Sequence, residues 1–127
     1  MDAQLKKDAC CIMLPREELI LEQIERNWEM LIAQGGTVHY HEGHVLFYEN
    51  HVPFGFFFLK EGEVVSSRMG LSGERMVLTS VKEGPLGLLH LVTNTTYCAT
   101  ATAKEDVEAI FIPKSVVLEF LKKGESL

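Results

Sequence analysis

Several features that mark common functional classes are missing from this chain of 127 residues. No apolar run approaches the ~20 residues that cross a bilayer, and the N-terminus carries no signal-peptide core. The three cysteines form no C-x-x-C spacing, which argues against a structural zinc site. No nucleophile–base set, P-loop or paired-carboxylate motif is present, so we do not expect an enzyme.

A clustered positive charge is also lacking. The net charge is -6, whereas a nucleic-acid or acidic-membrane surface needs gathered Lys and Arg. We therefore expect neither partner, and we expect a cytoplasmic protein. The odd number of cysteines argues against a secreted disulfide framework. Cys98 is expected to be a small buried residue, and Cys10 and Cys11 to lie on an irregular arm.

The longest stretch without charge is the segment from Gly84 to Ala103, which contains no Asp, Glu, Lys or Arg. A Gly-containing turn followed by an apolar stretch and a run of small residues can bring backbone N–H groups close to a ligand. The segment thus has the form of an anion cradle without the charge that usually completes one.

The rest of the chain predicts a helix, a series of strands and a second helix. Pro15 with Glu17 and Glu18 suits a helix start, and Gly35-Gly36 ends a helix of about five turns. A last short helix is expected from Pro113-Lys114-Ser115. The strands are expected at Thr37–Tyr40, Val45–Tyr48, Phe54–Leu59, Glu63–Met69, Arg75–Val81, Thr100–Ala103 and Val107–Ile112.

Turn residues recur every 8–12 positions, the rhythm of a β-sandwich or barrel. We therefore predict a mainly β fold: a jelly-roll β-barrel of about eight strands, with an N-terminal helix and a short C-terminal helix. The chain divides into an irregular arm at residues 1–14 and one domain at residues 15–127, which is long enough to bury a core.

Three segments together resemble the cyclic-nucleotide-binding domain of the catabolite-activator type, over roughly residues 20–123. His41–Phe47 resembles the family's Lys-x-Gly-Glu-x-Ile-Phe strand. Phe56–Val64 is similar to its Leu-Tyr-x-Ile-x-x-Gly-x-Val segment, and Glu108–Lys114 to its closing strand and helix start. The resemblance implies a ligand-sensing or regulatory domain with a phosphate-binding cassette.

That cassette reads approximately Phe-Gly-Glu-Leu-Ala, then several residues, then Arg-Ser-Ala-Thr in the family. On this chain it falls on Leu86, Gly87, Leu88, Leu89 and His90, and then on Tyr97, Cys98, Ala99 and Thr100. Leu88 stands where the family has the Glu that binds the ribose hydroxyl. Tyr97 stands where it has the Arg that pairs with the cyclic phosphate, and Cys98 replaces the Ser.

Loss of both charged groups has a calculable consequence. A hydrogen bond to a charged group contributes roughly 1.5–3 kcal/mol, so cyclic-nucleotide binding should weaken by about two to four powers of ten. We predict a small-molecule sensor or regulatory domain with altered or lost cyclic-nucleotide affinity. Tyr97 either stacks on an aromatic effector or fills the empty pocket. Backbone amides after Gly87 leave a weak anion site open.

Two other functions remain open at this point. One is a protein-interaction module that has a vestigial pocket and a protein partner in trans, with homodimer formation through the helices as a further option. The other is a metal- or haem-binding cupin-like protein. We leave the cofactor unknown.

The cupin-like alternative rests on histidines. His39, His41 and His44 lie close together with Glu42, but no later carboxylate–Gly–His combination completes a cupin set, so we favour a solvated strand end. For haem, His90 or Cys98 could supply an axial ligand, against a packed or hydrogen-bonded His90.

Overall fold

The computed structural model describes residues 14–125, and the side chains of residues 14–123. The predicted arm at residues 1–14, with Cys10 and Cys11, lies outside this range apart from Leu14, so its structure stays a prediction. Within the described range, four helices and eight strands follow one another along the chain. The helices are α2 (Pro15–Arg26), α3 (Trp28–Ala33), α4 (Leu88–Thr93) and α5 (Lys114–Glu125). The strands are β1 (Gly36–Tyr40), β2 (Val45–Phe47), β3 (Gly55–Glu61), β4 (Val64–Met69), β5 (Arg75–Val81), β6 (Gly84–Leu86), β7 (Thr100–Ala103) and β8 (Val107–Pro113).

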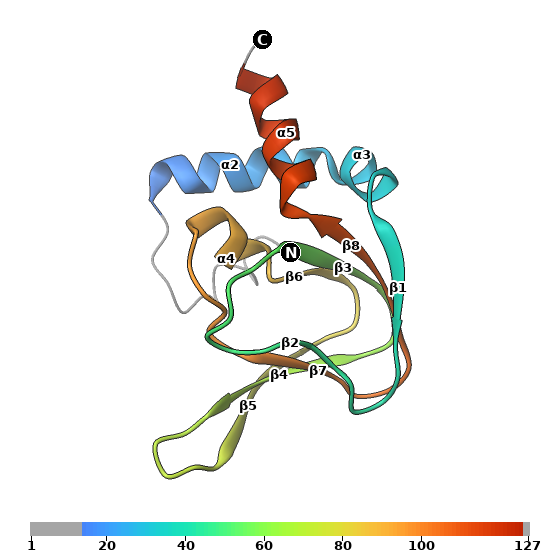
Figure 1. Cartoon of the computed structure of the whole chain (residues 1–127), viewed down its shortest axis with the longest axis vertical. Coiled ribbons are helices and arrows are strands. Elements are labelled where there is room, and N and C mark those ends of the chain that lie inside the picture. Colours follow the sequence, from blue (N-terminus) through green and yellow to red (C-terminus); the bar gives the residue numbers. More distant parts are fainter. Residues whose placement is uncertain (1–13, 126–127) are drawn as a thin grey trace.

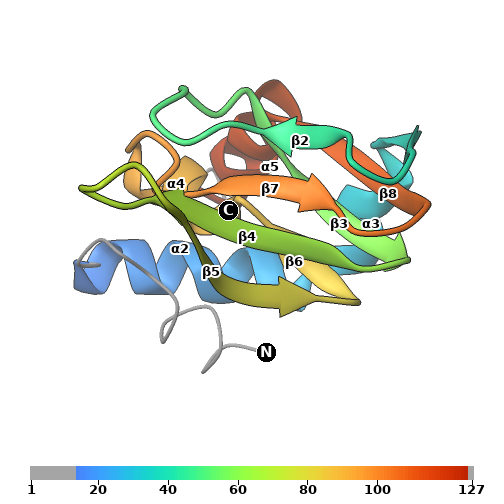
Figure 2. The same cartoon turned by 90° about the horizontal axis from the view of Figure 1, so that it is seen from below.

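The strands form two antiparallel four-stranded sheets. Their orders are β1-β8-β3-β6 and β2-β7-β4-β5, and the prediction of a mainly β jelly roll is confirmed. The helices gather at one end of the barrel, and the β4–β5 hairpin extends from the other end (Figure 1). Seen from below, the second sheet lies across the front of the molecule (Figure 2).

The predicted single N-terminal helix is wrong, because the structure has two. Pro15 occupies the first turn, and the Leu14 N–H donates to Glu17 Oε1 at 2.8 Å, so the helix begins as expected. It ends at Arg26, because Asn27 leaves helical geometry with φ -123° and ψ 29°. The Asn27 side-chain amide donates to the Gln23 carbonyl at 2.7 Å, a local bond that competes with continued helix.

Two apolar clusters hold the fold together. The first lies between the sheets and is made of Leu46, Phe57, Leu59, Val64, Leu86, Ala101, Ala103, Val107 and Ala109. The second joins the helices to the first sheet and is made of Leu21, Ile24, Leu31, Phe56, Leu88, Ile112 and Val117. The segment predicted to carry function, residues 84–103, therefore contributes residues to both clusters.

Candidate ligand-binding cassette

The charge-free segment forms a strand, a helical turn and a loop that returns to the second sheet. Leu86 at the end of β6 pairs with Phe57 of β3. Gly87 then takes a left-handed conformation with φ 79° and caps α4, a conformation that glycine adopts without strain. Two backbone bonds join the loop after α4 to the segment after β2: the Tyr97 N–H donates to the His51 carbonyl at 3.0 Å, and the Tyr97 carbonyl accepts from the Asn50 N–H at 2.7 Å.

Tyr97 fills the space beside Gly87. Its ring stacks on Phe47 with centroids 4.0 Å apart and planes at 15°. A Cβ at Gly87 would lie 2.9 Å from Tyr97 Cε1, so the ring also packs directly against the Gly87 backbone. The hydroxyl donates a long bond of 3.4 Å to the Gly55 carbonyl. Burial raises the pKa of Tyr97 to about 12, so the phenol is neutral.

Leu88 does not lie free in a pocket. It is fully buried in the cluster beneath the helices, with Leu21 and Ile24 of α2. The structure therefore brings Gly87 and Tyr97 together as the sequence predicted, while Leu88 belongs to the core. The other cassette residues are also largely enclosed: Leu86, Leu89, His90, Ala99 and Thr100 are buried.

Cys98 departs from its prediction. It lies in the loop before β7 rather than inside a sheet, where it is half-buried, and it is disulfide-bonded. The expectation of a small buried residue is wrong. A disulfide is uncommon in a reducing compartment, and the cytoplasmic location stays a prediction.

His90 is packed and hydrogen-bonded, as the sequence analysis favoured. Its side chain is 9% exposed, its Nδ1 lies 3.0 Å from Thr95 Oγ1, and its ring meets the Tyr97 ring edge-on at 6.0 Å. Burial lowers the pKa of His90 below the ordinary value, since the charged imidazolium loses hydration. This residue connects α4 to Tyr97.

The lowered pKa of His90 predicts a pH-dependent stability. The unfolded chain takes up a proton near pH 6.5 that the folded chain takes up only at lower pH. The free energy of unfolding should therefore be highest above pH 6.5 and decline as the pH falls from there toward the folded-state pKa. Urea unfolding at several pH values measures this, and His90→Gln should reduce the slope. The exposed control His39→Gln should retain it; an unchanged slope in His90→Gln would contradict the assignment.

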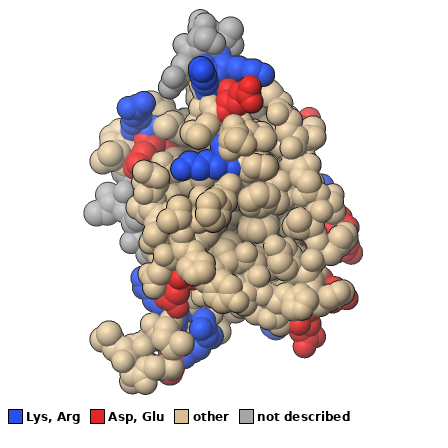
Figure 3. Space-filling model, viewed as in Figure 1, with Lys and Arg blue, Asp and Glu red and all other residues tan. Residues whose placement is uncertain are grey.

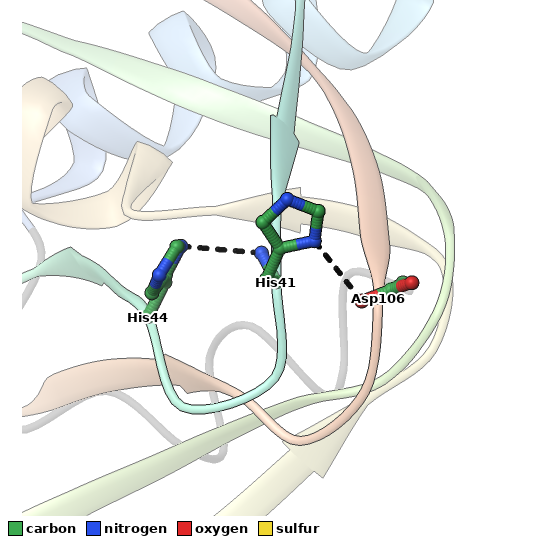
Figure 4. A network of polar contacts seen from close by, with 3 residues as sticks. All are labelled: His41, His44 and Asp106. Atoms are coloured by element: carbon green, nitrogen blue, oxygen red, sulfur yellow. Dashed lines mark hydrogen bonds and ion pairs between the residues drawn. The ribbon is translucent and has the colours of Figure 1, made fainter.

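The three predicted histidines lie at an exposed strand end, which confirms that part of the analysis. His41 Nδ1 lies 3.3 Å from Asp106 Oδ1, and the His41 N–H donates to His44 Nδ1 at 3.3 Å (Figure 4). His39 Nε2 lies 4.0 Å from Glu108 Oε1. The His39 and His41 side chains are 66% and 77% exposed. Among the described residues no group of three or more His, Cys, Asp or Glu could hold a metal ion.

Charge is also sparse on the surface of one broad face. In the view of Figure 3, Lys, Arg, Asp and Glu lie mostly at the margins, and the central area is largely uncharged. None of the helices in the described part of the chain is both long and apolar enough to span a bilayer.

Comparison with known proteins identifies the family of this domain. A model of the cyclic nucleotide-binding domain matches residues 37–124, which include both sheets, the cassette and most of α5. The chain belongs to the cyclic nucleotide-binding domain family. No curated protein sequence matches it.

Several solved structures share the fold of this domain. A proposed cAMP-binding regulatory protein from Silicibacter pomeroyi DSS-3 superposes with a TM-score of 0.70 at 24% identity, covering 78% of this chain and 46% of its own. The catabolite activator protein of Thermus thermophilus has a TM-score of 0.69 at 20% identity, covering 87% and 48%. A transcriptional regulator from Thermotoga maritima has a TM-score of 0.66 at 17% identity, covering 76% of each chain. The domain spans less than half the length of the first two.

Three features of the cassette were not predicted from the sequence. The first is β6, which is absent from the predicted strands. The second is α4, because Leu88–Thr93 shows no cap signal before it other than Gly87. The third is Phe47 as the partner of Tyr97. These residues are far apart in the chain, and their segments are brought together by the pairing of β2 with β7 and by the backbone bonds of Tyr97 to residues 50 and 51. Nothing local in the sequence marks that contact.

Proposed function

We propose that this domain is a regulatory sensor whose cassette has lost most of the family's affinity for cyclic AMP and cyclic GMP. Membership of the cyclic nucleotide-binding family supports a regulatory rather than a catalytic role. The observation that carries the altered specificity is the stack of Tyr97 on Phe47 beside Gly87. A side chain of the protein occupies the position where, by the resemblance, an arginine would meet a cyclic phosphate.

The energetics support the same conclusion. An anionic phosphodiester at this position would displace a buried ring and meet no guanidinium. Loss of a bidentate arginine removes roughly 1.5–3 kcal/mol of binding, and desolvation of the anion without a counter-charge adds to the cost. The uncharged, aromatic lining instead suits a neutral or aromatic effector.

A thermal-shift experiment tests the lost affinity. Cyclic AMP or cyclic GMP at about 1 mM should leave Tm unchanged, whereas a site with a dissociation constant near 1 µM would add ~4 kcal/mol of stability at that concentration. Tyr97→Arg restores the family's cation, and its cyclic-nucleotide affinity by calorimetry should be about 10- to 100-fold above that of the natural domain.

Tyr48→Arg is the matched control, since Tyr48 is 53% exposed and gives the same change of charge away from the stack. It should bind no better than the natural domain. Circular dichroism on each variant confirms that it is folded. Tight, saturable binding of either nucleotide by the natural domain would overturn the proposal.

A further inference from the structure

The β4–β5 hairpin carries an unusual concentration of exposed apolar side chains. Met69, Leu71, Met76, Val77 and Leu78 are 46% to 111% exposed. Exposed apolar groups gathered on one element mark an interaction surface more often than scattered ones do, and methionine adapts well to a partner. The hairpin extends from the end of the barrel opposite the helices (Figure 1).

Strand pairing decides how a partner can bind this hairpin. β5 is the edge strand of its sheet, and its register with β4 shifts between Ser66 and Ser67. Ser66 pairs with Thr79 and Ser67 with Val77, so Leu78 is an extra residue on β5. A bulge of this kind twists an edge and hinders simple strand addition. A partner is therefore expected to contact side chains rather than extend the sheet.

The two arginines of the hairpin differ in their contacts. The hairpin and its flanking residues carry no net charge, since residues 63–83 contain three Lys or Arg and three Glu. Arg75 donates to Ser67 Oγ at 2.8 Å. Arg68 is exposed, and it forms no ion pair with any residue of the described range. A partner surface should thus combine apolar and acidic groups.

The outer face of α2 has that combination. Leu19 is 64% exposed, and the exposed Glu18 and Glu22 lie beside it, one turn apart. Like charges at this spacing repel each other mildly. Across residues 14–123, neither carboxylate has a cationic partner in an ion pair. A cation from a second molecule would relieve the repulsion while an apolar group covered Leu19.

We propose that the β4–β5 hairpin of one copy docks on the outer face of α2 of a second copy, with Arg68 against Glu18 and Glu22. Arg68 is opposite in charge to the two glutamates, and each surface includes exposed apolar side chains. Figure 2 places β5 and α2 on the same side of the molecule, away from β2. Two copies related by a two-fold axis would make the contact twice. This inference concerns a surface outside the cassette and does not depend on the proposed ligand specificity.

Charge reversal tests the proposal directly. Sedimentation velocity on the full chain should show a monomer–dimer equilibrium that weakens at higher salt. Arg68→Glu and Glu22→Arg should each raise the dimer dissociation constant about tenfold or more, because each places like charges together. An equimolar mixture of the two variants should recover association, since a mixed dimer has opposite charges at both contacts.

Substitutions of exposed apolar residues by Asp provide an independent test. Leu71→Asp and Val77→Asp should abolish dimer formation, while Leu118→Asp, at a residue 54% exposed on α5, should leave it unchanged. All of these positions are exposed, so the variants should fold. A chain that stays monomeric at ~500 µM, where even weak pairs associate, would overturn the proposal. So would a dimer insensitive to Arg68→Glu, or a mixture that fails to recover.

Discussion

Tyr97→Ala is expected to lower the free energy of unfolding by about 3–5 kcal/mol, the range for truncation of a buried aromatic side chain. The Tyr97 ring is only 5% exposed and stacks on Phe47 at 4.0 Å. Its removal also uncovers the backbone at Gly87, which the ring now contacts. Urea or guanidinium unfolding followed by circular dichroism measures the loss.

Tyr97→Phe separates the ring from the hydroxyl. The bond to the Gly55 carbonyl is long, at 3.4 Å, so its loss should change the free energy of unfolding by no more than ~1 kcal/mol. Tyr48→Ala is the control for an exposed tyrosine and should stay within about 0.5 kcal/mol. If Tyr97→Ala proved as mild as Tyr48→Ala, the ring would not be an integral part of the fold, and a ligand could displace it at little cost.

Much of the fold could be predicted because its signals are local. A turn such as Gly70–Glu74 closes on itself, with the Gly70 N–H donating to the Glu74 carbonyl at 2.7 Å. The residues on either side then pair as β4 and β5 in the predicted places. The last helix follows Pro113 as expected, and its apolar face, which includes Val117, packs on the helical cluster. Turn chemistry and periodicity are sufficient for such elements.

The ends of the helices were harder to predict, because they depend on competition between the helix and local side-chain hydrogen bonds. An apolar stripe continues across Asn27 from Ile24 to Leu31, so periodicity alone predicts one helix there. The break depends on whether the Asn27 side chain bonds locally or points to solvent, and the sequence does not decide this. α4 has 6 residues, which is fewer than two helical turns. It is too short for a periodic pattern to distinguish it from a loop.

The ligand-binding role of the cassette stays a prediction, and the structure shows how its residues pack. Gly87 and Tyr97 are in contact, as the resemblance implied. Leu88, which stands at the family's glutamate, packs with Leu21 and Ile24 in the core. A helix rotates each successive side chain by about 100°, so a small change in where α4 begins moves a side chain from pocket to core. That start depends on tertiary packing.

Leu88→Glu is therefore expected to destabilise the domain by roughly 4 kcal/mol or more. Removal of a buried leucine alone costs about 2–5 kcal/mol, and even a protonated carboxyl without hydrogen-bond partners adds ~1–3 kcal/mol. Because small domains are stable by only about 5–15 kcal/mol, a large fraction of the variant should be unfolded at physiological temperature. Differential scanning calorimetry and near-ultraviolet circular dichroism detect the loss.

The outcome also decides how the cassette relates to the rest of its family. If Leu88 faced the ligand site, the glutamate would be solvated there and the domain would remain folded. Combined with Tyr97→Arg, Leu88→Glu would then strengthen cyclic-nucleotide binding beyond that of Tyr97→Arg alone. Leu88→Met, which keeps the apolar volume, should cost less than ~1.5 kcal/mol and confirms that the charge is responsible. A folded Leu88→Glu domain would place residue 88 at the ligand. An unfolded one means that two substitutions cannot restore the site, because the position of the lost glutamate now serves the packing of α2.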